Sequence, residues 1–437
     1  MSINIEKLRL ENKHSVLTRL TLTDLIFEND MKKNITYNDI NIRTDLIRDK
    51  VVEKLKEHNI FLGKQYGVKG IPIKKLLEES TSLDYHIEIP TGHIINYNIQ
   101  DLRQLSFKHK IIFVDFEESN VAPIKWIDDS QQERKTFFNE FLKISGFNLN
   151  NTYFASPNIE KNRICKDINF YYIFVVMASL CSNITIDILL NNNKEQYIEI
   201  LKNRPYEKFF VFKNWSARPW RVALLSILNK HRILDEIDWS LVGEYGPHKF
   251  NDNKDFVKEY FSKYTNNKWI EENYFKEEIQ QFFVERINEL PKFLYEHEYS
   301  AKVESIDVWT SPINDLKKYR YSIDVESCSF LSEKQVKSFL MGSMPFVIYP
   351  YKTNRYIQQL KHLNFNIVDV ELEKKNIESH LENSADKIIF LKENDICPDI
   401  AEIIHNFEMC VDSNKLVDYV TQPLIDTFIS DDKYVRT

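Results

Sequence analysis

Short apolar runs alternate with amphipathic stretches along most of this chain, and such alternation is typical of α/β proteins. One alternating region extends from about residue 83 to residue 205, and another extends from residue 208 to about residue 391. Helical patterns precede the first region and follow the second. We therefore predict an α/β fold of two Rossmann-like domains, with helical additions at both ends of the chain.

The first region is predicted to supply four strands, and the segment before it a helix. The helix covers residues 43–60, where apolar side chains recur on one side at helical spacing. These patterns indicate a first domain over residues 1–205. The predicted strands are Tyr85–Ile89, Ile111–Phe116, Thr152–Ala155 and Ile184–Leu190.

The second region contains two strand–turn–helix motifs with a long helical segment, Asn251–His297, between them. Apolar runs at Ile367–Val370 and Lys387–Leu391 predict further strands. These patterns indicate a second domain over residues 206–395. The remaining residues, 396–437, have a helical pattern.

Residues 321–349 predict a strand, a loop, a helix and a second strand in succession. The first strand ends at Glu326, and the second covers Phe346–Tyr349. Ser332 suits the N-cap of the helix and Gly342 suits its C-cap. The segment is therefore expected to belong to an α/β sheet.

Polar side chains gather in the loop and at the helix start of this segment. Glu326 and Glu333 supply carboxylates, Lys334 an ammonium and Ser332 a hydroxyl. Together with the N–H groups of a helix N-terminus, they are suited to bind a ribose and a diphosphate. An ordinary capped helix without a ligand would explain the same residues.

Residues 208–228 form the other motif of the second region. An apolar strand is followed by a polar turn at Asn214, and then Pro219, Trp220 and Arg221 lead into a helix. An Arg at a helix N-terminus opposes the macrodipole unless an anion lies beside it. The position of Arg221 therefore favours a bound phosphate, and the alternative is a surface Arg stacked on Trp220.

Three acidic residues lie at the carboxyl end of the predicted strand Ile111–Phe116: Asp115, Glu117 and Glu118. In open α/β sheets, ligands bind outside the carboxyl ends of the strands. A carboxylate there is a candidate general base. The alternative is a set of solvated turn residues.

The order of residues in these segments resembles that of the alpha-1,3-fucosyltransferases and related nucleotide-sugar glycosyltransferases. In that family a Glu precedes a Thr-Glu-Lys triplet at a helix start, and an earlier strand is followed by an Asn and by an Arg that binds the diphosphate. Ser332-Glu333-Lys334 keeps the hydroxyl of the triplet. The resemblance implies that the donor is held by Asn214, Arg221, Glu326, Ser332, Glu333 and Lys334.

The resemblance also implies a general base. The family has a strand ending in Glu-Ser with a Pro straight after, whereas here Glu118 and Ser119 are followed by Asn120, and the Pro is Pro123. Glu118 is the first choice for the base. Asp115 and Glu117 remain alternatives.

The implied fold is of the GT-B type, in which two Rossmann-like domains face a cleft. The first domain would bind the acceptor, the second would bind the donor, and the C-terminal helices would pack back on the first. The implied reaction is an inverting transfer of a fucosyl, hexosyl or pentosyl group from a GDP- or UDP-sugar, GDP-fucose being the first choice. No convincing Asp-x-Asp motif ends a strand, which favours a metal-independent enzyme without a tightly bound cofactor.

The acceptor is expected to be a glycan hydroxyl. A hydroxylated base of viral DNA is an alternative, because aromatic residues such as Trp126 and Phe154 suit stacking on a sugar or on a base. A non-catalytic scaffold that binds a nucleotide or a glycan is the alternative of another class.

Composition narrows these possibilities. A net charge of −7 disfavours a dedicated nucleic-acid binder without excluding DNA. The five cysteines are scattered, so neither a disulfide framework nor structural zinc is expected. The charged N-terminus lacks an apolar signal core, and we expect no transmembrane segment and a cytoplasmic protein, in the host cytoplasm if its source is viral. The oligomeric state stays open.

Overall fold

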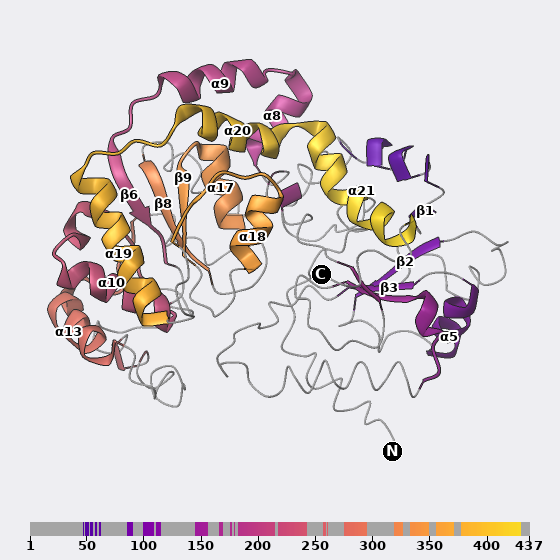
Figure 1. The fold of residues 1–437 in the computed structure, drawn as a ribbon, viewed down its shortest axis with the longest axis horizontal. Helices are drawn as coiled ribbons and strands as arrows, with labels where there is room; N and C mark the ends of the chain where they lie inside the picture. The colour runs from indigo at the N-terminus through magenta and orange to yellow at the C-terminus, as the bar shows by residue number, and fades with distance from the viewer. Residues whose placement is uncertain are drawn as a thin grey trace. The chain divides into compact units, whose positions relative to one another are not determined.

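The computed structural model shows two compact units, which we describe separately (Figure 1). The first comprises Met1–Asn120, Asp128–Cys181 and Asp412–Thr437, and the second comprises Val121–Ile127 and Ser182–Val411. The domain boundaries at residues 205 and 395 stay predictions. The structure describes residues 47, 49–51, 53–55, 57–58, 61–62, 85–90, 99–108, 111–114, 145–155, 166–168, 175–176, 179, 182–214, 217–242, 257–258, 260, 275–294, 319–326, 333–348, 355–370 and 377–429.

The first unit contains a five-stranded sheet in the order β1-β2-β3-β4-β5, in which every pair of neighbours is parallel. The predictions of strands at Tyr85–Ile89 and Thr152–Ala155 are confirmed, and that at Ile111–Phe116 is confirmed as far as Val114. The strands are β1 (Phe61–Leu62), β2 (Tyr85–Pro90), β3 (Ile111–Val114), β4 (Thr152–Ala155) and β5 (Lys166–Ile168), and α5 (Ile99–Lys108) precedes β3.

Helical residues from the two ends of the described chain meet in the first unit. Ile47, Val51 and Leu55 are buried at four-residue spacing in the helix predicted over residues 43–60. Lys50 Nζ donates a hydrogen bond of 2.8 Å to Ser413 Oγ at the start of α21 (Ser413–Ile429). This hydrogen bond joins α21 to the N-terminal helical segment.

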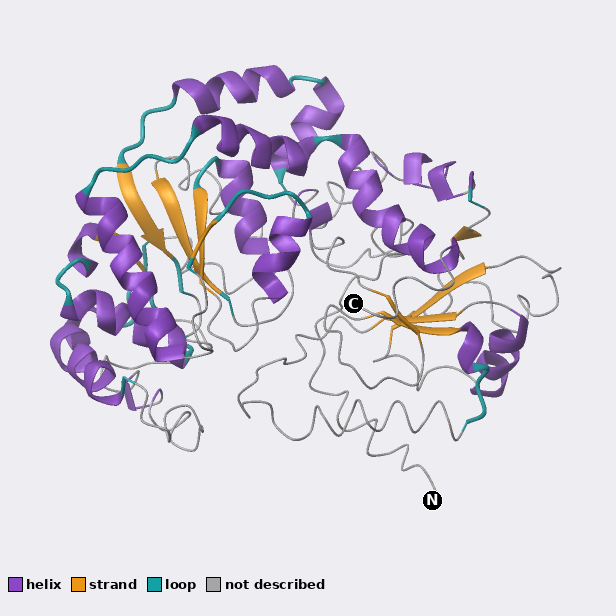
Figure 2. Cartoon of the chain, viewed as in Figure 1, coloured by secondary structure: helices purple, strands orange, loops and turns teal. Residues whose placement is uncertain are grey.

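The second unit contains a five-stranded parallel sheet in the order β10-β9-β8-β6-β7 (Figure 2). The chain passes from β6 to the edge strand β7, and then returns to β8 on the other side of β6. The connections from β6 and from β8 therefore run in opposite directions. The strands are β6 (Lys208–Phe212), β7 (Ile237–Trp239), β8 (Tyr319–Val325), β9 (Met344–Ile348) and β10 (Val368–Asp369).

Helices pack in two groups beside the second sheet (Figure 1). One group centres on α10, which contacts α13 and α19, and the other joins α17 to α20, which contacts α8 and α9. Most residues of β8 and β9 are buried between them. The helices are α8 (Asn183–Asn191), α9 (Lys194–Asn203), α10 (Pro219–Lys230), α13 (Lys276–Arg286), α17 (Glu333–Met341), α18 (Arg355–His362), α19 (Ile377–Glu393) and α20 (Ile400–Val411).

Two strand predictions are wrong. Ile184–Leu190 lies in α8, where the Ser182 side chain caps the helix by accepting a hydrogen bond from the Ile184 N–H at 3.2 Å. Lys387–Leu391 lies in α19, whose buried positions recur at three- and four-residue spacing along 17 residues. In both cases the apolar run is a short window of a helix, and its length alone did not distinguish the two structures.

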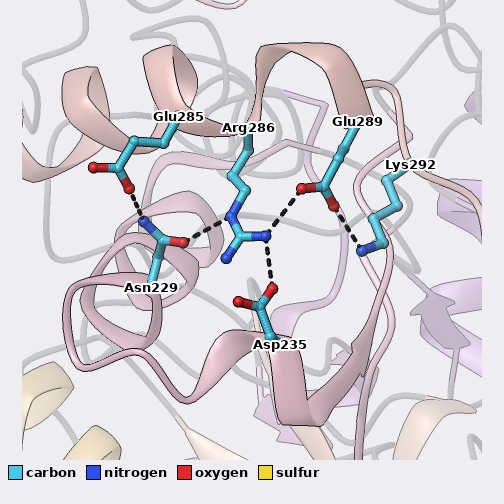
Figure 3. A network of polar contacts seen from close by, with 6 residues as sticks. All are labelled: Asn229, Asp235, Glu285, Arg286, Glu289 and Lys292. Atoms are coloured by element: carbon cyan, nitrogen blue, oxygen red, sulfur yellow. Dashed lines mark hydrogen bonds and ion pairs between the residues drawn. The ribbon is translucent and has the colours of Figure 1, made fainter.

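A polar network surrounds Arg286, which ends α13 (Figure 3). Arg286 Nη1 contacts Asp235 Oδ1 at 2.6 Å and Glu289 Oε1 at 2.9 Å. Arg286 Nε donates to Asn229 Oδ1 at 2.8 Å, and Lys292 Nζ pairs with Glu289 Oε2 at 3.0 Å. The network thus ties α10, α13 and the turns around them together.

Candidate functional site

Four of the residues predicted to bind a donor lie at the carboxyl edge of the second sheet. Asn214 follows β6, and Arg221 lies in the first turn of α10, the helix that leaves β6. Glu326 follows β8 directly, and Lys334 lies in the first turn of α17, the helix that leaves β8. Because these two connections diverge, the residues border a topological switch point, where ligands bind in open α/β sheets.

Asn214 joins the ends of β6 and β7 and is buried. Its backbone N–H donates to Ser240 Oγ at 3.1 Å, and its carbonyl accepts from the Val242 N–H at 3.2 Å. The side-chain Nδ2 donates a long hydrogen bond, 3.5 Å, to the Phe212 carbonyl, and Oδ1 has no hydrogen-bond partner among the described residues. A buried acceptor without a partner is unfavourable, so this oxygen is a candidate ligand contact.

Arg221 links the start of α10 to the end of β8. Its Nε donates to the Val325 carbonyl at 3.3 Å, and the side chain is buried. Pro219 is the first residue of α10, and Arg218, in the N-cap position, makes no side-chain capping bond. A guanidinium at the positive end of a helix is stabilised by negative charge beside it.

The Glu326 carboxylate is fully buried beneath the first turn of α17. Oε2 forms an ion pair with Lys334 Nζ at 3.3 Å, and Oε1 accepts a hydrogen bond of 2.7 Å from Gln335 Nε2. The Glu326 N–H donates to the Ile348 carbonyl at the end of β9. Glu326 therefore joins β8, β9 and α17, and 29% of the Lys334 side chain is exposed.

A second buried carboxylate, Asp324, lies two residues earlier on β8. It accepts hydrogen bonds from Ser322 Oγ at 2.9 Å and from Ser338 Oγ at 3.4 Å. Burial raises the pKa of Asp324 to about 7, with a further contribution from Glu326 that Lys334 and the two serines oppose. Its protonated and ionised forms are therefore both populated near neutral pH.

Sequence reasoning missed both Asp324 and Gln335. The signal for Asp324 was the alternation of polar residues at 322, 324 and 326, which places them on one face of a strand. The signal for Gln335 was its position on the apolar face of α17, one helical turn before Phe339.

Several predicted residues lie outside the described part of the chain. These are Ser332 and the three base candidates, Asp115, Glu117 and Glu118. Glu333 is the first residue of α17, but its side chain also lies outside that part. Their roles stay predictions.

Within the described ranges, no three His, Cys, Asp or Glu side chains are grouped so that they could hold a metal ion. Nor does any helix there combine the length and the apolar character that crossing a membrane requires.

No protein-family model matches the chain, and no curated protein sequence matches it significantly. The chain is similar in structure to alpha,alpha-trehalose 6-phosphate synthase from Burkholderia multivorans, with 11% identity, 82% of this chain and 72% of that chain covered, and a TM-score of 0.37. It is also similar to the UDP-forming alpha,alpha-trehalose-phosphate synthase from Burkholderia xenovorans, with 11% identity and a TM-score of 0.38. The similarity covers 84% of this chain and 77% of that chain.

The chain is also similar to the glycosylation-associated protein complex Gap123 from Streptococcus agalactiae, with 12% identity, coverage of 82% of this chain and 56% of that chain, and a TM-score of 0.35. At these identities and TM-scores the similarities assign no activity. We therefore derive the function from the residues at the sheet edge. The predicted α/β class itself is confirmed by the parallel sheet and flanking helices of the structure.

Proposed function

We propose that the carboxyl edge of the second sheet binds a nucleotide diphosphate sugar, and that the chain is an inverting glycosyltransferase. The observation that carries this proposal is the position of Arg221 and Lys334. They come from separate motifs, lie in the first turns of α10 and α17, and border the same switch point. Helix N-termini and cations together favour a diphosphate.

The proposed roles follow from the chemistry of the transfer. Arg221, Lys334 and the helix N–H groups stabilise the departing diphosphate, which needs no metal ion when cations are fixed in place. Asn214 contacts a hydroxyl group of the donor. Glu326, Ser332 and Glu333 complete the donor site, and Glu118 takes the proton of the acceptor hydroxyl.

The proposed donor is a GDP- or UDP-sugar, and the proposed acceptor is a glycan. A hydroxylated DNA base is the alternative acceptor. Incubation of the chain and donor with a glycan panel and with hydroxymethylated DNA distinguishes the two, because only the true acceptor gains the mass of the sugar.

The donor site is tested first by the thermal unfolding of the full chain with GDP, UDP, CDP and ADP, each with and without EDTA. A ligand that binds only the folded state raises the melting temperature by mass action. We expect one nucleoside diphosphate to raise it, with no change on addition of EDTA. Loss of the effect in EDTA would contradict metal independence.

The variants Lys334→Met and Arg221→Met are expected to lose this response. Lys230→Met is the matched control, because Lys230 ends α10 and forms an exposed ion pair with Glu278. It should respond as the wild type does. If no nucleotide raises the melting temperature of the wild type at millimolar concentration, the proposal fails in favour of a scaffold without donor binding.

A further inference from the structure

The contact between β8 and α17 contains two buried carboxylates, from Asp324 and Glu326, and one ammonium, from Lys334. Charged groups can be buried only when hydrogen bonds and opposite charges compensate the loss of water. Neutral donors supply part of this compensation, since Gln335 donates to Glu326, and Ser322 and Ser338 donate to Asp324.

Gln335 is the neutral residue that donates a hydrogen bond to Glu326. Its amide is fully buried and donates to Oε1 at 2.7 Å, whereas Lys334 is 3.3 Å from Oε2. The shorter contact is the one made by the neutral amide. The hydroxyl groups of Ser322 and Ser338 likewise donate hydrogen bonds to Asp324.

Removal of the Gln335 amide would leave Oε1 buried without this donor. Lys334 is the charged donor already in contact with the same carboxylate, so it would be drawn closer to Glu326 to compensate. An ammonium engaged in this way is less available to a diphosphate. The side chain of Gln335 thus affects ligand binding without touching the ligand.

We infer that Gln335 is a positioning residue of the donor site: its amide holds Glu326 so that Lys334 can direct its ammonium to the diphosphate. This inference rests on the proposed function.

The test uses Gln335→Met in the full chain, since Met has a similar length and no N–H donor. The dissociation constant is measured by calorimetry for GDP, UDP, CDP and ADP. We expect the affinity for the preferred nucleotide to fall about tenfold, equivalent to about 1.4 kcal/mol. The salt dependence of binding should also weaken, because one cation contributes less.

A double-mutant cycle separates positioning from a general loss of structure. In a Glu326→Gln background there is no carboxylate charge to attract Lys334, so Gln335→Met should change the affinity by less than about twofold. If Gln335→Met weakens binding equally in both backgrounds, the role is structural and the inference is overturned.

Asn406→Ala controls for stability. Asn406 is buried on α20 and makes two hydrogen bonds of 2.7 Å with the backbone of Asn366, which precedes β10 at the opposite edge of the sheet. The Asn406→Ala substitution should lower the melting temperature and leave the nucleotide affinity unchanged.

A wild type that binds none of the four nucleotides overturns the proposed function and with it the inference. A Gln335→Met variant that binds as the wild type does overturns the inference alone.

Discussion

At the scale of single residues, Asp324 makes stability depend on pH in an unusual direction. Its pKa rises from 3.8 to about 7 in the folded chain, so the folded state binds its proton more tightly than the unfolded state does. The stabilisation is complete below the unfolded pKa and is lost as pH rises through the folded pKa. Asp324→Asn, which needs no proton, should therefore be more stable than the wild type at pH 8. Its advantage in stability over the wild type should be smaller at pH 5.

Melting temperatures of both proteins between pH 4 and pH 8 check this prediction. Ser322, Ser338, Glu326 and Lys334 face Asp324 and are unchanged in the variant. A constant difference between the two proteins across this range would contradict the raised pKa.

The proposed base, Glu118, gives a second prediction at this scale. Glu118→Gln keeps the size of the side chain but cannot take a proton, so kcat should fall by roughly 10²- to 10⁴-fold. The dissociation constant of the donor nucleotide should not change. Asp115→Asn and Glu117→Gln are the matched variants, and a larger loss of kcat in one of them would move the role of base to that residue.

At the scale of elements, Arg286 is the centre of the network in Figure 3. Arg286→Met should lower the free energy of unfolding by roughly 1–2 kcal/mol, because it removes charge-assisted bonds that are only partly exposed. Urea unfolding at pH 7 measures the loss. Lys230→Met breaks one exposed ion pair between the same two helices, α10 and α13, and should cost less than about 0.5 kcal/mol.

The same network should weaken in acid. The hydrogen bond from Arg286 lowers the pKa of Asp235, and those from Gln281 and Asn229 lower the pKa of Glu285. A carboxylate with a lowered folded pKa stabilises the fold above its unfolded pKa, and this contribution is lost as pH falls through the folded pKa. The difference between Arg286→Met and the wild type should therefore shrink from pH 7 to pH 3, and an undiminished difference would contradict an ionic origin.

At the scale of the whole molecule, the two sheets define which amides should exchange most slowly with solvent. Amides open with free energies that follow local burial, and β8 and β9 are the most completely buried strands of the second unit. We expect their amides to exchange last in mass-spectrometric measurements on the full chain. The preferred nucleotide should slow exchange further at the starts of α10 and α17, but not at Asn229 and Lys230.

The sequence predicted the second sheet and its edge well, because β6 is an apolar run, β8 alternates apolar with polar residues and ends beside Glu326, and α10 and α17 show helical spacing over several turns. It did not predict α8 and the end of α19 as helices, since mainly apolar segments of five to seven residues are compatible with either structure. It also missed Gln335, because a polar residue on a helix looks ordinary until the buried carboxylate beneath it is known.

No described residue donates to Oδ1 of Asn214, and this oxygen would therefore impose a chemical selection on a ligand that binds there. A carbonyl oxygen accepts hydrogen bonds and cannot donate one, and the oxygens of a fully ionised diphosphate are likewise acceptors only. Inorganic pyrophosphate can therefore accept from cations but cannot donate to this oxygen, whereas a ribose or sugar hydroxyl can donate to it. The edge should thus discriminate between a bare anion and one that carries a hydroxylated ring, and Asn214→Leu should bind both more nearly alike.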